Sequence, residues 1–412
     1  MKQEGWWKTW REARSLSQGR KIVFFGRSED WVQKSLLKIG RPVECIVDSN
    51  TSYHDTQYHG LPVRAPNILF SGPKYDTYVI ITAGPYEGIV ATLLEHGLQP
   101  GSDFCCCPEY YDFQLLEYMR NYQQRVIVSC SDYLDKTHAR YSRAGGGLYR
   151  YHIGPNKMDI LVPGQFRQIE KVGDSYFAIE YVEMKVYVLD TEFNVITTYP
   201  LDRPNYCGIA YDAKRDIVVV ANSTTDELSV HERDGFKLIN RVPYSRKASD
   251  GLRSPHHLND VTIDGDYLYV SYFSHTGGWR KGQYDGGISE YHLDRLSDGP
   301  SPMAGGLWSP HSPKIFEGNL CYLDSMRGRL HVSNQSIAAE FPGFARGLAY
   351  DGNFYYVGMS EDMYLSRVYS QRNCIMMNAG FYMLDLMTRA ARFYPMLDNM
   401  NIHDLMVLDA PQ

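Results

Sequence analysis

Five segments of the chain repeat one plan, and this repetition limits the possible folds more than any other feature of the sequence. Each segment has a polar entry, an apolar strand, a turn that is often Asp-Gly or Glu-Gly, a second apolar strand and a polar exit. The starts fall near residues 166, 206, 257, 311 and 345, an irregular period of about 35 to 55 residues that is typical of β-propeller blades. The segments are FRQIEKVGDSYFAIEY, YCGIAYDAKRDIVVVAN, HLNDVTIDGDYLYVSYF, HSPKIFEGNLCYLDS and ARGLAYDGNFYYVGMS.

The two ends of the repeat region predict a sixth blade. Residues 402–412 supply a single strand, whereas 125–134, 146–154 and 157–164 read as three strands that lack an innermost one. A propeller is stable only when its open sheet edges are paired. We therefore expect a six-bladed β-propeller over residues 125–412, closed by the C-terminal strand.

Residues 20–105 follow a different pattern. Apolar runs at 21–26, 43–48 and 75–84 alternate with helical patterns at 30–40 and 86–97, which predicts a parallel α/β sheet. The expected fold class is α/β plus all-β. We expect a Rossmann-like domain with an N-terminal helix (1–109), a helical connector (110–124) and the propeller (125–412).

The predicted phosphate loop departs from the dinucleotide pattern. That pattern is Gly-x-Gly-x-x-Gly, but Gly26 is followed by Arg27, Ser28 and Glu29. Arg27 and Ser28 would replace part of the lost backbone contacts to phosphate, whereas Glu29 would repel it. Asp48 ends the second strand, where such folds bind a ribose hydroxyl. Two alternatives stay open: a docking or oligomerisation domain without a ligand, or a nucleotide or nucleotide-sugar site formed by Gly26, Arg27, Ser28 and Asp48.

The propeller repeats predict a site at one mouth of the central channel. The innermost strands of all blades start on the same face, so their polar entries converge there. Pro310 and Pro313 flank His311, and Pro255 precedes His257; proline fixes its own φ and restricts the residue before it. Such rigid support suits a binding or catalytic site. The entry residues are Arg167, Gln168, Cys207, His257, Asn259, Asp260, His311, Arg346, His403 and Asp404.

Long loops add further candidates on the same face. The segments 131–147, 274–287 and 359–380 exceed the usual hairpin length, so we expect them to surround a pocket. They contribute Trp279, Arg280, Lys281 and Arg367, and a tighter turn contributes Asp324 and Arg327.

The residue types at this mouth suit acid–base chemistry on an anion. Histidine exchanges protons near neutral pH, and arginine binds carboxylate or phosphate through a bidentate fork. The sequence predicts an anionic sugar-like substrate that undergoes proton abstraction, elimination or epimerisation. The predicted catalytic residues are His257, His311, His403 and Asp404. The predicted substrate-binding residues are Arg167, Asn259, Asp260, Trp279, Arg280, Asp324, Arg327 and Arg346.

Other interpretations of the same residues stay open. His257, His311 and His403 would serve as ligands of a divalent metal in a hydrolase or lyase, although the sequence has no local spacing such as HExxH and the neighbouring arginines oppose a bare cation. Cys207 is a candidate nucleophile or a buried structural thiol. The histidines would otherwise be structural, Arg346 would plug the channel, and the propeller would be a non-catalytic module that binds a glycan or a protein.

Composition excludes several classes of partner. Lys and Arg number 42 against 48 Asp and Glu, a net charge of −6 that argues against nucleic acid and against a polybasic membrane surface. The sequence has no apolar run long enough to span a membrane and no secretory segment at its start, so we expect a cytoplasmic protein. The eight cysteines form no CxxC pair and predict neither a disulfide framework nor a zinc ribbon. Homo-oligomerisation stays open.

Several long motifs carry a family resemblance. HHLNDVTIDG, GGWRKGQYDGG, GLWSPHSPKIFEGNLCYLDSMRGRL and FPGFARGLAYDGNFYYVGMSE resemble an uncharacterised bacterial family, a domain of unknown function with a propeller-like fold, over about 125–412. The resemblance places His257, Asn259, His311, Asp324 and Arg346 in the family's motifs and implies no established reaction. More distantly, the layout is similar to gluconolactonase-type propellers, which use a metal at the mouth; Arg167 stands where their acidic first-blade ligand aligns.

The N-terminal half carries a second resemblance. KIVFFG, IVDSN, HGLPV and YVIITAGPYEGI resemble the small Rossmann-like domains that bacteria place beside sugar-modifying and polysaccharide-biosynthesis proteins. The resemblance implies a role in surface-polysaccharide or nucleotide-sugar metabolism.

Overall fold

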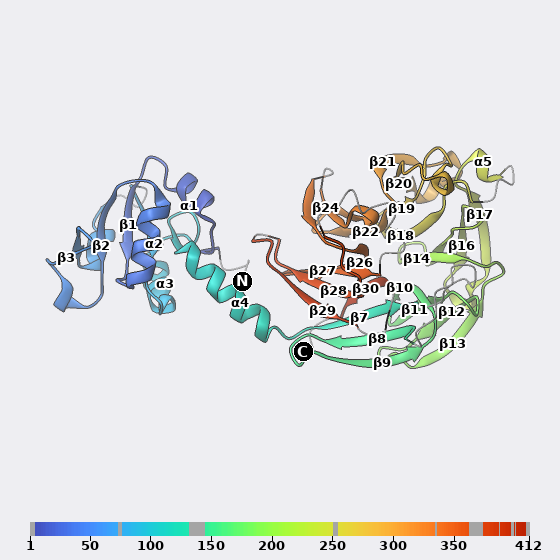
Figure 1. Ribbon diagram of the computed structural model, residues 1–412, viewed down its shortest axis with the longest axis horizontal. Coiled ribbons are helices and arrows are strands. Elements are labelled where there is room, and N and C mark those ends of the chain that lie inside the picture. Colours follow the sequence, from blue (N-terminus) through green and yellow to red (C-terminus); the bar gives the residue numbers. More distant parts are fainter. Residues whose placement is uncertain are drawn as a thin grey trace. The chain divides into compact units, whose positions relative to one another are not determined.

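The computed structural model divides the chain into two compact units, Met1–Tyr122 and Gln123–Gln412 (Figure 1). We describe each unit by itself. The structure describes residues 5–72, 76–131, 145–249, 254–333, 336–361, 374–386, 388–396, 399 and 401–408.

The first unit is built on a mixed, mostly parallel sheet of six strands in the order β3-β4-β2-β1-β5-β6. Strands β1, β2, β4, β5 and β6 pair in parallel, and β3 pairs antiparallel with β4. The central strands are continuous apolar runs because both of their faces are buried. This sheet fits the predicted α/β class, and the Rossmann-like assignment stays a prediction. The strands are β1 (Lys21–Phe25), β2 (Val43–Val47), β3 (Gln57–Tyr58), β4 (Leu61–Arg64), β5 (Thr77–Ile81) and β6 (Phe104–Cys106).

The described residues of this unit form the α-helices α1 (Trp10–Leu16), α2 (Glu29–Ile39), α3 (Tyr86–Glu95) and α4 (Pro108–Asn121). Local sequence sets their ends. Thr9 and Glu12 form a capping box at the start of α1, and Gly40 ends α2 in the left-handed region at φ 65°.

The second unit is a six-bladed β-propeller, as the sequence predicts. Each of six sheets has four strands, and the innermost strands lie at the centre of this unit in Figure 1. These strands neighbour one another in the order β10, β14, β18, β22, β26, β30 and again β10. They are β10 (Phe166–Val172), β14 (Tyr206–Asp212), β18 (Leu258–Asp264), β22 (His311–Phe316), β26 (Phe344–Tyr350) and β30 (Ile402–Val407).

The other strands complete the blades in sequence order. The first five sheets run β10 to β13, β14 to β17, β18 to β21, β22 to β25 and β26 to β29. The outer strands are β11 (Ser175–Glu180), β12 (Lys185–Leu189), β13 (Val195–Pro200), β15 (Ile217–Asn222), β16 (Glu227–Glu232), β17 (Leu238–Pro243), β19 (Tyr267–Tyr272), β20 (Gly286–His292), β21 (Ser301–Leu307), β23 (Asn319–Asp324), β24 (Arg329–Val332), β25 (Ile337–Glu340), β27 (Tyr355–Ser360), β28 (Gly380–Leu384) and β29 (Ala391–Pro395).

The sixth sheet joins the two ends of the propeller sequence. Its order is β30-β7-β8-β9, with β7 (Arg125–Cys130), β8 (Gly147–His152) and β9 (Lys157–Pro163). Strand β30 pairs antiparallel with β7, and it also contacts β26 and β10.

The propeller core lies between neighbouring blades. Val219 and Leu228 from one sheet and Leu258, Val270 and Tyr291 from the next belong to one buried apolar cluster. Apolar side chains on facing sheets interdigitate in this way because each sheet must bury both faces. The described residues contain no helix that is long and apolar enough to cross a membrane.

Candidate functional site

Every innermost strand of the propeller contains a β-bulge or register irregularity near its first residues. A bulge leaves residues outside the hydrogen-bonded ladder and changes the direction of their side chains. Most of the polar entry residues fall at these positions, so the bulges place polar side chains outside the ladder at the start of the innermost strands. The residues between the flanking pairs are Arg167, Gln168, Cys207, Asn259, Asp260, Ser312, Pro313, Arg346, Gly347 and His403.

Four of the predicted residues contact one another, and we call Arg167, His311, Arg346 and His403 the mouth cluster. Arg346 Nε donates to His311 Nε2 at 3.0 Å, and Arg346 Nη1 lies 3.4 Å from His403 Nε2. Arg167 Nη1 lies 2.9 and 2.8 Å from the two ring nitrogens of His403. Arg167 on β10 and Arg346 on β26 thus both contact His403 on β30, and Arg346 also contacts His311 on β22.

His311 uses both ring nitrogens inside the protein. Its Nδ1 lies 2.9 Å from the carbonyl oxygen of Ser309 and 2.8 Å from Ser325 Oγ. Because the carbonyl can only accept, Nδ1 carries the proton and the Nε2 lone pair accepts from Arg346. Burial, and then the charge of Arg346, holds the pKa of His311 well below its usual value. The ring is neutral near pH 7 and positions Arg346. Sequence reasoning missed Ser309 and Ser325, which fix this tautomer.

His257 lies against an aromatic wall. Its ring centroid is 4.4 Å from that of Phe273 and 4.6 Å from that of Trp279, whose Nε1 donates to the carbonyl of Ser254 at 2.9 Å. The backbone of His257 is left-handed at φ 55°, a conformation that is uncommon for a residue with a side chain. Burial, with the positive charges of Arg346 and Arg167, lowers the pKa of His257 to about 3.

The predicted rim residue Arg280 is exposed beside this wall. Its guanidinium lies 5.1 Å from the centroid of the Trp279 ring. It also lowers the pKa of His257 through its charge, after burial and the two other arginines.

Among the described residues, two buried donors at this mouth have no hydrogen-bond partner: Arg167 Nε and Asn259 Nδ2. The Arg167 guanidinium also lies 4.1 Å from the centroid of the Tyr181 ring, within reach of a cation–π contact. A buried donor without an acceptor is costly, so most such groups in native proteins are satisfied. The two atoms therefore suit an acceptor that the described part of the chain does not supply.

The predicted carboxylates of Asp260 and Asp404 accept hydrogen bonds from neighbouring innermost strands. Asp260 accepts hydrogen bonds from Ser312 N at 2.8 Å and Ser312 Oγ at 3.2 Å, and Asp404 accepts from Ile169 N at 3.2 Å. Burial raises the pKa of Asp404 to about 6 and also raises that of Asp260. This structural role differs from the catalytic and substrate-binding roles that the sequence suggested for these two residues.

Gln168 makes the most connections of this kind. Its Nε2 donates to the carbonyl of Val261 at 2.7 Å, and its Oε1 accepts from Ile209 N and Val261 N, both at 3.1 Å. It thereby joins β10 to β14 and β18. We call Gln168, Asp260, Ser312 and Asp404 the channel belt.

Asp324 and Arg327 form a separate pair. Asp324 accepts from Trp308 N at 2.8 Å and from Arg327 Nη1 at 3.1 Å, and the Arg327 guanidinium lies 4.5 Å from a ring centroid of Trp308. The pair fixes the turn that contains Ser325, so it acts on the mouth cluster indirectly through His311.

The remaining predictions at the mouth have mixed outcomes. Cys207 Sγ lies 3.4 Å from Ser223 Oγ, and burial raises the pKa of its thiol, which disfavours a nucleophilic role. Most of the loops 131–147 and 359–380, including Arg367, lies outside the described residues.

Within the described ranges, no three His, Cys, Asp or Glu side chains are arranged to hold a metal ion. Of the predicted ligands His257, His311 and His403, two contact arginine through their ring nitrogens.

Comparison with known proteins gives one family match. Residues 253–408 match the family described as a domain of unknown function, DUF4915. The match includes His257, His311, Arg346 and His403, whereas Arg167 precedes it. No curated protein sequence matches the chain.

Several solved structures are similar to the chain at low identity. The chain is similar to a chain of the nidogen/laminin complex (13% identity, 69% of this chain and 98% of that chain covered, TM-score 0.47). It is also similar to a protein of unknown function from Bacteroides caccae (8%, 70% and 100%, TM-score 0.46). A third is regucalcin, a calcium-binding protein from Agrobacterium tumefaciens (12%, 53% and 70%, TM-score 0.39).

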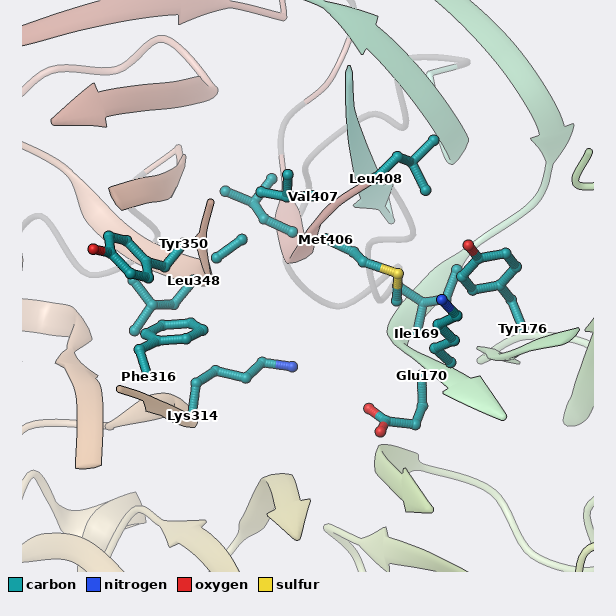
Figure 2. Close-up of a pocket in the computed structure, with 13 residues that line it drawn as sticks. Ile169, Glu170, Tyr176, Lys314, Phe316, Leu348, Tyr350, Met406, Val407 and Leu408 are labelled. Atoms are coloured by element: carbon teal, nitrogen blue, oxygen red, sulfur yellow. The ribbon is translucent and has the colours of Figure 1, made fainter. Parts of the chain in front are cut away.

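A second cavity lies where the innermost strands end, and sequence reasoning missed it. It encloses about 270 Å³ and is shown in Figure 2. Lys314 lies within the DUF4915 match, and Glu170 lies before it. Both are charged residues in the second halves of innermost strands, FRQIEKV and HSPKIF, beside the apolar residues Ile169 and Ile315.

Charge interactions at this cavity link it to the channel belt. Lys314 Nζ lies 3.8 Å from Asp404 Oδ1. Burial alone would lower the pKa of Lys314, but the carboxylates of Asp404, Glu170 and Asp260 together raise it. Burial raises the pKa of Glu170 to about 7, against the opposing charge of Lys314.

We expect Glu170→Gln to gain stability relative to the wild type as pH rises. A raised pKa in the folded state means that Glu170 folds most favourably while protonated, at pH values below its unfolded pKa. This contribution is lost as pH rises through about 7. Glutamine cannot ionise, so the difference in the free energy of unfolding should change by about 2 kcal/mol, allowing for solvent screening. Urea unfolding of both proteins between about pH 5 and pH 9 measures it.

The control for this experiment is Glu192→Gln, an exposed carboxylate in a turn of the same unit. Its difference from the wild type should not vary with pH. If Glu170→Gln gave the same flat difference, the assignment of a raised pKa to Glu170 would be wrong.

The predicted ligand residues of the first unit have partners within it. A Cβ on Gly26 would lie 2.4 Å from Ala83 Cβ, so glycine is needed there for the approach of two loops. The Arg27 guanidinium lies 3.6 Å from the centroid of the Tyr53 ring, Ser28 Oγ accepts from Gly84 N at 3.3 Å, and Asp48 Oδ1 accepts from the amide of residue 50 at 2.8 Å. The nucleotide site stays a prediction.

Proposed function

We propose that the mouth cluster binds a small anion, a carboxylate or phosphate group on a sugar-like molecule. The observation that carries the proposal is the pair of buried donors without acceptors, Arg167 Nε and Asn259 Nδ2, beside a second guanidinium. Arginine binds both anion types through charge-assisted hydrogen bonds. The aromatic wall of Phe273 and Trp279 would pack against the apolar face of a sugar ring.

Charge supports an anion over a cation. Low pKa values keep His257, His311 and His403 neutral near pH 7, so the positive charge of the cluster comes from its two arginines. Asp260 lies near Arg346, but it already accepts two hydrogen bonds from Ser312. The cluster therefore favours a negatively charged ligand.

The same features favour binding over acid–base catalysis. A histidine with a strongly lowered pKa is a poor proton acceptor, and His311 has no free ring nitrogen. We therefore propose binding of the anion as the main function and its chemical transformation as the second candidate. A role in surface-polysaccharide or nucleotide-sugar metabolism rests on the resemblance of residues 20–105.

We also propose the finer description of the fold. The pairing of β30 with β7 and its contacts with β26 and β10 support closure of the ring by the C-terminal strand. The parallel pairing of β1 with β2 and β5 supports a Rossmann-like first domain, with bounds of 1–109, 110–124 and 125–412.

Titration calorimetry tests the proposal with glucose 6-phosphate, glucuronate and neutral glucose. We expect the two anions to bind and glucose not to bind detectably. Arg167→Met should weaken anion binding by about tenfold to a hundredfold, because it removes charge-assisted hydrogen bonds. Arg203→Met, which removes an arginine paired with Glu227 elsewhere on the propeller, should bind as the wild type does. Unchanged affinity in Arg167→Met, or binding of glucose equal to that of the anions, would contradict the proposal.

A further inference from the structure

The cavity at the far end of the innermost strands combines apolar walls with charges of both signs, the partly buried Glu170 and Lys314 and the exposed Lys171. Figure 2 shows the Lys314 ammonium and the Glu170 carboxylate directed into the same space from different sides. Phe316, Leu348 and Met406 are among the apolar side chains around them. A concave apolar site with a few polar groups is the usual form of a small-molecule site.

Both charged groups keep hydrogen-bonding capacity for a ligand. Lys314 has three donors, and its distance of 3.8 Å from Asp404 is longer than a hydrogen bond. The Glu170 carboxylate accepts a hydrogen bond from the backbone of Tyr211, and among the described residues no side chain donates to it. The two groups influence each other's pKa through space. A ligand with only one charge would satisfy one of the two groups and leave the other with only its partner in the protein, the carboxylate of Asp404 or the backbone of Tyr211.

The apolar walls determine the size and the apolar character of the rest of the ligand. Phe316 and Tyr350 pack with ring centroids 5.6 Å apart on one side, and Ile169 and Met406 line the other. Sites for drug-sized molecules enclose about 300 to 1,000 Å³, so a cavity of about 270 Å³ suits a smaller molecule.

We propose that this cavity binds a small zwitterion with an apolar side chain, of the amino-acid type. The ligand carboxylate would contact Lys314, its ammonium would contact Glu170, and its side chain would pack against Phe316 and Met406. The site is distinct from the mouth cluster, because its lining residues come from the other ends of the innermost strands. Asp404 of the channel belt is 3.8 Å from Lys314 Nζ.

Titration calorimetry at about pH 8, where Glu170 is ionised, tests this proposal with three ligands of matched apolar body. These are L-phenylalanine, 2-phenylethylamine and 3-phenylpropanoate. We expect phenylalanine to bind at least tenfold more tightly than either singly charged analogue. Glu170→Gln and Lys314→Met should each weaken phenylalanine binding at least tenfold, and Glu192→Gln should leave it unchanged.

A cavity-filling variant keeps the test decisive if Lys314→Met fails to fold. Met406→Trp leaves both charges in place but occupies the cavity, so it should abolish phenylalanine binding while the far-ultraviolet circular dichroism stays that of the wild type. The proposal is overturned if phenylalanine does not bind the wild type, if a singly charged analogue binds as tightly, or if Glu170→Gln retains the wild-type affinity.

Discussion

Gln168→Met should lower the free energy of unfolding of the propeller by about 3 to 4 kcal/mol. Gln168 is 1% exposed and makes three hydrogen bonds to backbone groups of Ile209 and Val261. Methionine has a similar shape but no strong donor or acceptor, so two buried N–H groups and a carbonyl would lose their partner. Urea-induced unfolding of the full chain, followed by circular dichroism, gives the value.

The matched control is Gln283→Met, in which an exposed glutamine changes in the same way. It should alter stability by less than about 0.5 kcal/mol. A similarly small effect at Gln168 would show that the channel belt contributes little to the joining of the blades.

Gly358→Ala should destabilise the propeller by about 2 to 3 kcal/mol and weaken anion binding at the mouth cluster. A Cβ at Gly358 would lie 2.0 Å from the carbonyl oxygen of Arg346 and 2.7 Å from Ile402 Cγ2. The first contact cannot be relieved without moving the backbone of β26, where Arg346 is part of the bulge, and the second requires the Ile402 side chain on β30 to shift as well. Urea unfolding and calorimetry with glucose 6-phosphate measure the two effects.

Gly305→Ala provides the control, since a Cβ there meets no atom within 4 Å. It should leave anion binding intact and change stability by no more than about 1 kcal/mol, in the stabilising direction. If Gly358→Ala behaved like Gly305→Ala, the backbone around Arg346 would be more adaptable than the close approach implies.

The propeller was predictable because its blades repeat a local pattern. The apolar strands and their Asp-Gly or Glu-Gly turns set the strand boundaries, and the six-bladed fold is confirmed. The polar entries also located the end of the strands where Arg167, His311, Arg346 and His403 meet.

The roles of individual side chains were not predictable, because they depend on contacts between distant segments. Asp404 accepts from the backbone of Ile169, and Asp260 from that of Ser312, so neither hydrogen bond has a sequence signature. Bulges likewise add residues to a strand without a distinctive residue type. The cavity around Lys314 and Glu170 was not predicted because the repeated polar pattern marks the strand starts, whereas these residues lie further along the same strands.

The six bulges at the mouth also affect how this fold can diversify. Because the bulged residues lie outside the ladders, those that are not part of the channel belt can be exchanged while the strands of each blade still pair. Bulge positions such as Arg167, Arg346 and His403 are thus replaceable parts of the mouth. A new ligand preference would require substitutions at a few bulge positions and no redesign of the blades that hold them.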